Sequence, residues 1–288
     1  VWLQGEGHFK SSNPEVVAQA AKLHADALGL LDRILTQNLF QARGAFGFFP
    51  ANRSGDDIVV WADESRAGPR AVLHTLRQQV AKEGARPNYA LADFVAACDA
   101  PHPRDYLGAF VVGIHGADGF AARLEAAHDP YNAIMAKALA DRFAEAFAEV
   151  LHHHARLAWG YEQPGQFTND QLIKENYRGI RPAPGYPAQP DHTEKDILFD
   201  LLRAGEATGV SLTESRAMHP GAAVCGLYFS HPESRYFSIS DLQQDQVEDY
   251  AKRTAEKAWN APEVAAERQQ QAEQARQAKR DRGPSLGR

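Results

Sequence analysis

Residues 44–63, GAFGFFPANRSGDDIVVWAD, decide the fold class. The runs 44–51 and 57–63 are short and rich in aromatic or β-branched residues, and the NRSGD between them is typical of a turn. This order of strand, turn and strand predicts a hairpin of two antiparallel strands. The expected starting element of the fold is therefore a hairpin rather than a βαβ unit.

Hydrophobic periodicity and turn residues predict the remaining elements. Further strands are expected over 90–96, 108–115, 209–215, 222–230 and 235–240, with HPES (231–234) as a hairpin turn between the last two. Helices are expected over 13–35, 68–83, 130–158, 169–177, 193–208 and 240–259. Strands in hairpin-like pairs with helices between them indicate an α+β protein. We expect a single domain over 1–260, with a largely antiparallel bent sheet flanked by helices and a C-terminal helix, and then a flexible tail over 261–288, frayed or disordered.

Two of these helices carry clear signals. Asn13 and Pro14 are a good N-cap and first residue for the first helix. Its apolar positions predict one buried stripe of Val16, Ala20, Leu23, Ala27, Leu30 and Ile34. The helix over 130–158 is expected to bury Met135, Leu139, Phe143, Ala146, Phe147 and Val150. Its opposite side carries Glu145, and the His152–His154 triplet is interpreted as a solvated helix end.

Composition excludes several function classes. The 288 residues hold 31 basic and 37 acidic side chains, a net charge of −6, which argues against non-specific nucleic-acid binding. There is no apolar run long enough to span a membrane. Only Cys98 and Cys225 are present, which excludes a cysteine-rich zinc site and is typical of a reducing cytoplasm. The first residue is Val1 rather than Met, which is typical of a piece of a longer chain. GxGxxG after a strand, GxxxxGK[ST], GxSxG and HExxH are all absent.

The segment RPAPGYPAQP (181–190) has an unusual density of proline. Proline fixes φ and removes N–H donors, and Gly185 permits a turn or a close backbone approach. Arg181 offers a planar fork for a carboxylate, and Tyr186 offers an aromatic face with a hydroxyl. The segment is interpreted as a rigid loop that holds a zwitterionic small molecule. Composition alone favours slightly the alternative, a surface loop whose prolines only separate two helices.

The sequence resembles the activation domain of cobalamin-dependent methionine synthase. The resemblance rests on RPAPGYPAQPDHTEK (181–195) and extends through GFFPANRSGDDI (47–58), HDPYNAIMAKALADRFAEAFAE (128–149), YFSHPESRYF (228–237) and DQVEDYAKR (245–253). These motifs occur in order over roughly residues 13–255.

The resemblance implies a methyltransferase module of methionine biosynthesis that binds S-adenosylmethionine. Such a module donates the methyl group for reductive methylation of cob(II)alamin to methylcobalamin. The cobalamin would be carried by a neighbouring cobalamin-binding domain, and the electron would come from flavodoxin or a flavoprotein reductase. The chain has no DxHxxG cobalamin pattern and no zinc site for homocysteine, so it is not expected to make methionine by itself.

The resemblance also implies roles for particular residues. Arg181 would pair with the ligand carboxylate, the Ala183 carbonyl would accept from its amino group, and Tyr186 would lie near the sulfonium as the catalytic side chain. Gly185 belongs to the same motif. Tyr236 and Phe237 would contact the adenosine, and Glu145 would reach the ligand from the long helix if a cleft lies against that face.

Two departures from the family pattern stand out. The family's Asp-Trp motif would place an aspartate just before Trp2, and that aspartate is not in the sequence, so Ala183 is expected to carry more of the amino-group binding. Gln189 stands where the family commonly has cysteine.

Two other functions remain open at this point. The chain could serve as a non-catalytic docking module for a cobalamin domain or a flavoprotein reductase. Candidate docking residues are Arg66, Arg70 and Arg77, or the basic residues of the closing helix over 240–259. A metal-dependent hydrolase using Asp191, His192 and the His152–His154 triplet is the weakest alternative, because three consecutive helical residues point in different directions. We therefore expect no metal site.

Overall fold

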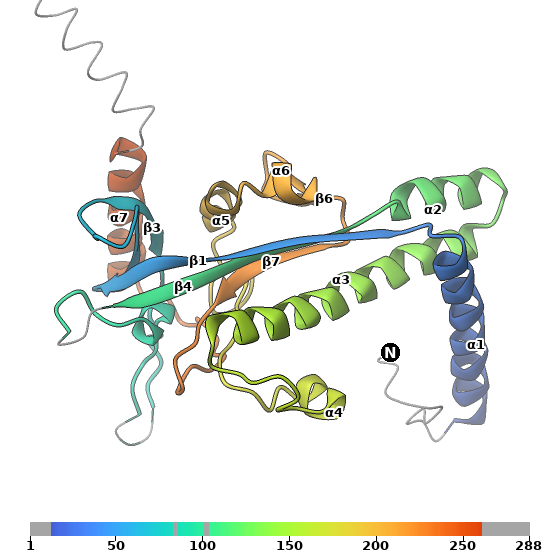
Figure 1. Cartoon of the computed structure of the whole chain (residues 1–288), viewed down its shortest axis with the longest axis horizontal. Coiled ribbons are helices and arrows are strands. Elements are labelled where there is room, and N and C mark those ends of the chain that lie inside the picture. The colour runs from blue at the N-terminus through green and yellow to red at the C-terminus, as the bar shows by residue number, and fades with distance from the viewer. Residues whose placement is uncertain (1–12, 83, 85, 101–103, 261–288) are drawn as a thin grey trace, which may run out of the picture.

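The computed structural model describes residues 13–82, 84, 86–100 and 104–260 (Figure 1). A five-stranded antiparallel sheet runs through the molecule in the order β3-β2-β1-β4-β7. Its strands are β1 (Gln41–Ser54), β2 (Asp57–Trp61), β3 (Pro69–His74), β4 (Asp105–His115) and β7 (Ala223–Tyr228). A separate two-stranded sheet pairs β5 (Ser211–Leu212) with β6 (Met218–His219). The predicted α+β class and antiparallel sheet are confirmed.

The predicted hairpin is present as β1 and β2, with Ser54 opposite Asp57. Gly55 lies in the turn at a φ of +63°, a conformation that glycine adopts without strain. On its other side β1 pairs with β4 from Gln41↔His115 to Ala51↔Asp105. This long ladder is the axis of the sheet in Figure 1.

Helices cover both faces of the sheet. The helices are α1 (Pro14–Thr36), α2 (Ala117–Ala126), α3 (Pro130–Trp159), α4 (Asn169–Ile173), α5 (Glu194–Leu202), α6 (Ala204–Thr208) and α7 (Gln244–Asn260), with a 3-10 turn at Leu91–Phe94. Alternate side chains of β4 lie on opposite faces of the sheet. Phe110 and Val112 pack against α3, whereas Val111 packs with α6. None of the helices within the described part of the chain is both long and apolar enough to cross a bilayer.

The long helix α3 lies on the sheet through small side chains. Asp129 caps its N-terminus by accepting from the Asn132 N–H, Pro130 opens it, and Gly160 ends it at a φ of +89°. Its buried positions are Ala133, Met135, Ala136, Ala140, Ala144, Ala148, Leu151, His152, Ala155 and Arg156. The predicted buried side is therefore wrong at Ala146 and Val150, which are exposed. Alanine at four-residue steps lets the helix backbone approach the strands closely, and larger side chains flank the contact.

Several predicted elements are corrected. Residues 69–74 form strand β3 rather than part of a helix, and 91–94 form a 3-10 turn rather than a strand. No strand forms over 235–240, so HPES does not close a hairpin. The predicted helix over 193–208 breaks at Arg203, which has a φ of +47°. Helix α2 was not predicted.

The two terminal helices differ from expectation in opposite ways. Only Leu30 and Ile34 of the α1 stripe are buried, whereas Val16 is 50% exposed. The closing helix α7 is confirmed and is anchored by polar contacts, in which Gln246 bonds the backbone of Arg77 and Tyr250 donates to Asp191 at 2.7 Å. The tail over 261–288 lies outside the described residues, so the domain boundary at residue 260 stays a prediction.

Candidate functional site

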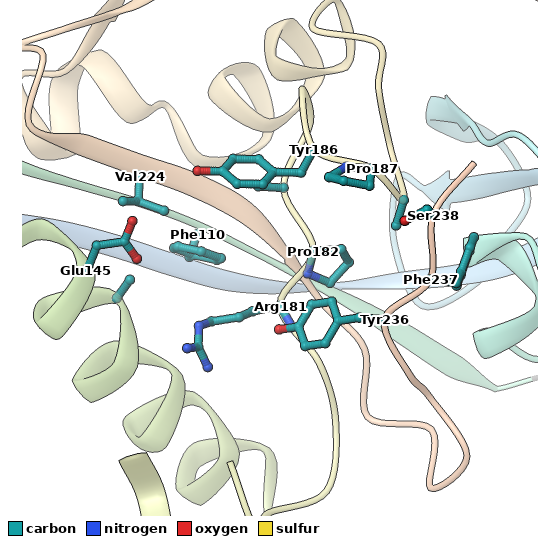
Figure 2. Close-up of a pocket in the computed structure, with 13 residues that line it drawn as sticks. Phe110, Glu145, Arg181, Pro182, Tyr186, Pro187, Val224, Tyr236, Phe237 and Ser238 are labelled. Carbon is teal, nitrogen blue, oxygen red and sulfur yellow. The ribbon is translucent and has the colours of Figure 1, made fainter. Parts of the chain in front are cut away.

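A cavity of about 440 Å³ opens between α3, the proline-rich segment and the chain after β7. Its size is within the range of small-molecule sites, which starts at about 300 Å³. Figure 2 shows the side chains around it. The lining residues are Phe110, Glu145, Ala148, Arg181, Pro182, Ala183, Tyr186, Pro187, Ala188, Val224, Tyr236, Phe237 and Ser238.

The proline-rich segment is attached to the edge of β7. Ile180 and Phe229 exchange backbone hydrogen bonds at 3.1 Å, and the Pro182 carbonyl accepts from the Leu227 N–H at 2.9 Å. Proline has no N–H of its own to satisfy, so pairing through its carbonyl leaves no buried donor. A side chain at Gly226 would meet the Pro182 oxygen at 2.7 Å, so this glycine permits the attachment.

Beyond Pro182 the segment forms a tight turn. The Tyr186 N–H donates to the Ala183 carbonyl at 3.2 Å, and the Gly185 N–H donates to the Gln189 carbonyl at 2.7 Å. The Ala183 carbonyl keeps its second lone pair for another donor. Gln189 is buried and its side-chain amide donates to the His74 carbonyl at 3.0 Å, so it ties the turn to β3.

Gly185 does not line the cavity but supports the turn from behind. Its φ is +94°, and a Cβ at this position would lie 2.2 Å from Cε1 of His192. The His192 ring is held by Lys195, whose Nζ lies 2.9 Å from Nδ1 and also donates to the Arg216 carbonyl at 3.0 Å. Because Lys195 can only donate, His192 Nδ1 is the acceptor. The ring is therefore wedged under the turn that presents Tyr186.

The Arg181 guanidinium at the cavity wall is already paired. Its Nη2 lies 2.7 Å from Glu149 and 3.0 Å from Glu175, and its Nη1 donates to the Tyr177 hydroxyl. Burial works to lower the pKa of Arg181, but Tyr177 and the two carboxylates outweigh it and the pKa is raised. The arginine is thus a permanent cation in a fixed position, only one-fifth exposed.

Tyr177 links Arg181 to a buried charged cluster. Burial raises the pKa of Tyr177, so its hydroxyl keeps a proton, which it donates to Glu149 at 3.2 Å. The Arg156 guanidinium lies over the Tyr177 ring at 3.6 Å and pairs with Glu162 at 2.5 Å. Arg156 is fully buried, as is His152, which stacks on Tyr228 at 4.6 Å. The interpretation of the histidine triplet as a solvated helix end is therefore wrong for His152.

The remaining cavity walls come from α3 and from the chain after β7. Glu145 reaches the cavity as an exposed carboxylate on α3 (Figure 2). The Tyr236 hydroxyl accepts from the Arg181 backbone N–H at 3.0 Å, and Phe237 packs with Tyr89 at 6.1 Å between ring centroids. Tyr186 and Tyr236 are 60% and 50% exposed, so both rings stand at the mouth.

Six of the seven residues named from the sequence thus line one cavity, and Gly185 lies behind it. The sequence reasoning did not name Phe110, Val224 and Ser238 in the wall or Tyr177 and Glu149 behind Arg181. Tyr177 lies within IKENYRGI (173–180), the stretch directly before Arg181, and this closeness is a signal that could have pointed to it.

Comparison with known families accounts for most of the chain. The sequence model of the family described as "Vitamin B12 dependent methionine synthase, activation domain" matches residues 3–255. The chain belongs to this family. The family assignment suggested by the proline-rich motif is confirmed, and the cavity described above lies within the matched part of this activation domain.

A solved structure agrees with the assignment. A crystal structure of the MetH reactivation domain bound to AdoHcy is similar to this activation domain with 51% sequence identity and a TM-score of 0.79. The match covers 84% of this chain and 75% of the other. The α+β fold is therefore that of a reactivation domain.

Asp191 and His192, which the hydrolase alternative would use, make contacts that hold the fold together. Asp191 accepts from Tyr250 and from the Thr193 N–H, and His192 contacts Lys195. Within the described ranges no group of three or more His, Cys, Asp or Glu side chains could hold a metal ion. Arg77, a docking candidate, is paired with Asp56 and Asp93.

Proposed function

We propose that the cavity binds S-adenosylmethionine and that the chain acts as the reactivation module of a cobalamin-dependent methionine synthase. The convergence of Arg181, Ala183, Tyr186, Tyr236, Phe237 and Glu145 on one cavity carries this proposal. AdoHcy, the ligand of the similar structure, is S-adenosylmethionine after loss of the transferred methyl group. That relationship supports a methyl donor as the ligand here.

The cavity offers one partner for each part of the ligand. The Arg181 guanidinium can attract the carboxylate while it shares its charge with Glu149 and Glu175, and the Ala183 carbonyl and the Glu145 carboxylate can accept from the amino group. Phe237 and the backbone around Tyr236 provide a wall for the adenosine. The Tyr186 ring at the mouth can stabilise the sulfonium cation through its π face.

Methyl transfer from a sulfonium needs orientation more than acid–base help, because a neutral thioether is a good leaving group. The protein's contribution is then to hold the methyl group toward the open side of the cavity. A cobalamin carried by another domain would supply the cobalt that accepts the methyl group, with one electron from a flavodoxin or flavoprotein reductase. Tyr186 is exposed at that open side, as a position beside the transferred group requires.

Isothermal titration with S-adenosylmethionine and AdoHcy tests the proposal. We expect the wild-type chain to bind both, and Arg181→Gln to bind at least about tenfold more weakly, since a charge-assisted pair contributes about 1.5–3 kcal/mol. Arg123→Gln, an exposed arginine on α2, is the matched control and should bind normally. A folded wild-type chain that binds neither compound would contradict the proposal.

The docking-module alternative predicts a different pattern. If the chain serves only as a surface for the cobalamin domain, Arg181→Gln would weaken association with cobalamin-loaded cobalamin-binding domain while S-adenosylmethionine gave no heat with any variant. If the proposal holds, Arg181→Gln loses ligand binding and keeps domain association. The same pair of titrations therefore separates the two functions.

A further inference from the structure

A second cavity, of about 600 Å³, adjoins the segment that carries Tyr236 and Phe237 through Arg235, which lines it. It is lined by Lys82, Arg86, Pro87, Tyr89 and Arg235. Three of these five residues are cations, and they come from two separate parts of the chain. We propose that this basic cavity is a binding site for a compact, multiply charged phosphate-bearing ligand.

Two of the three cations of the basic cavity, Lys82 and Arg235, are oriented by neutral groups. Lys82 Nζ donates to the Gln78 side-chain oxygen at 2.7 Å and to the Pro87 carbonyl at 2.6 Å. Arg235 Nε donates to the Glu233 backbone carbonyl at 3.1 Å. These bonds hold the side chains without neutralising them.

Tyr89 gathers two of the charges around one ring. Lys82 Nζ lies 5.2 Å and the Arg235 guanidinium 5.4 Å from the ring centroid. Both distances are within the range of cation–π contacts, which attract a cation without cancelling its charge. The ring itself is fixed by Phe94 and Phe237, at 6.0 and 6.1 Å between centroids.

The lining residues of the basic cavity include no carboxylate among the residues that the structure describes. Arg53, Arg77, Arg156, Arg181 and Arg253 each pair with aspartate or glutamate. Across the described residues, Lys82, Arg86 and Arg235 form no such pair. Three cations that line one hollow, with no ion pair to a described carboxylate, repel one another and attract an anion.

Phosphate chemistry fits this arrangement better than an acidic protein surface. Guanidinium groups bind phosphate oxygens in pairs, and lysine adds a point charge. A dianion or trianion inside a hollow can face all the cations at once, whereas an acidic protein surface would need the charges spread over a broad, flat face.

Titration with inorganic pyrophosphate at low ionic strength tests the site. We expect saturable one-to-one binding by the wild-type chain and binding about 100-fold weaker in Lys82→Gln/Arg235→Gln, because two charge-assisted contacts are lost. Lys22→Gln/Arg123→Gln removes the same charge from exposed positions on α1 and α2 and should bind as wild type. Matching urea midpoints for the three proteins would establish that all are folded.

Three results would overturn the proposal. The first is the absence of saturable pyrophosphate binding to the wild-type chain at millimolar concentration. The second is an equal loss of affinity in both double variants, which would mean that only net charge matters. The third is a triglutamate peptide that binds as tightly as pyrophosphate, which would assign the basic cavity to acidic protein segments instead.

Discussion

The two cavities that residues 235–238 help to line use positive charge in opposite ways. In the first, Arg181 is largely buried and already paired with Glu149 and Glu175. In the second, Lys82 and Arg235 are held by carbonyl oxygens and a tyrosine ring. A ligand of the first cavity must share a cation with existing carboxylates, whereas a ligand of the second would meet cations that form no ion pair within the described part of the chain.

The two cavities should therefore select their ligands differently, the first by the fixed position of its cation and the second by long-range electrostatic attraction. A paired, buried arginine contributes a precisely placed fork, and its ligand is selected by fit and by desolvation. Unpaired cations at a surface contribute long-range attraction, which falls with salt because the Debye length is about 10 Å at 0.1 M. The buried cluster of Arg156, Glu162 and Tyr177 belongs to the first strategy, since it holds Arg181 in place.

The largest contrast between the cavities should be in stability. Glu162→Leu leaves the Arg156 guanidinium buried without its carboxylate, and we expect a loss of about 3–5 kcal/mol in the free energy of unfolding. Lys82→Ala at the basic cavity should change it by less than about 0.5 kcal/mol, because that side chain is partly exposed and unpaired with any carboxylate described here. Urea unfolding measures both.

The double variant Arg156→Met/Glu162→Leu is the control for the buried pair. Removal of both charges leaves neither Arg156 nor Glu162 unpaired, and only the His153 contact with Glu162 is lost, so part of the lost stability should return. If Glu162→Leu alone unfolds at the wild-type urea midpoint, the buried cluster does not hold this wall of the first cavity.

The sequence predicted those parts of the fold whose signals are local. Asn13 with Pro14, and Pro130, mark helix starts, and the turn at Gly55 marks the hairpin. The predicted helix over PRAVLHTL (69–76) is wrong, because a short apolar run fits a helix or a strand equally well. Only pairing with β2 makes residues 69–74 a strand. The 3-10 turn at Leu91–Phe94 is likewise stabilised by its surroundings, since Asp93 pairs with Arg77.

Only part of the first cavity could be predicted from the sequence, because the position of several wall residues depends on how the helices pack on the sheet. Arg181 and Tyr186 stand in a motif whose chemistry can be read directly, and the resemblance supplied Glu145, Tyr236 and Phe237. Phe110 belongs to a strand where alternate side chains face opposite layers, so its place in the wall depends on which helix covers which face. The burial of His152 and Arg156 depends on Glu162 and Tyr177, which lie beyond the end of α3.

The next largest effect should come from the turn behind the first cavity. In Gly185→Ala the added methyl group would meet the His192 ring at 2.2 Å, at a φ of +94° that disfavours alanine. We expect a stability loss of about 1–3 kcal/mol and S-adenosylmethionine affinity at least about tenfold lower, because the turn that carries Tyr186 must shift. Titration calorimetry and urea unfolding measure the two effects.

Two further variants make the result for Gly185 specific. Gly55→Ala has a similar positive φ but open space around it, so it should lose stability and keep ligand affinity. Gly185→Ala/His192→Ala removes the ring that the methyl group would strike and should recover part of the affinity. If Gly185→Ala binds the ligand as wild type does, the turn does not shape the cavity.

The smallest expected effect is a dependence of the free energy of unfolding on pH, which arises from His152 next to Arg181. Burial, with Arg156, Arg181 and His153 nearby, holds the pKa of His152 well below its usual value. As the pH falls through about 6.5, the unfolded chain takes up a proton at this position and the folded chain does not, so stability falls with a limiting slope of about 1.4 kcal/mol per pH unit.

Urea unfolding from about pH 7.5 to 5.5 should show a shallower slope for His152→Gln than for wild type. His154→Gln, an exposed neighbour on α3, should keep the wild-type slope. Equal slopes in all three proteins would mean that His152 is protonated in the folded state, beside Arg156 and Arg181, and that the wall of the first cavity tolerates a third buried cation.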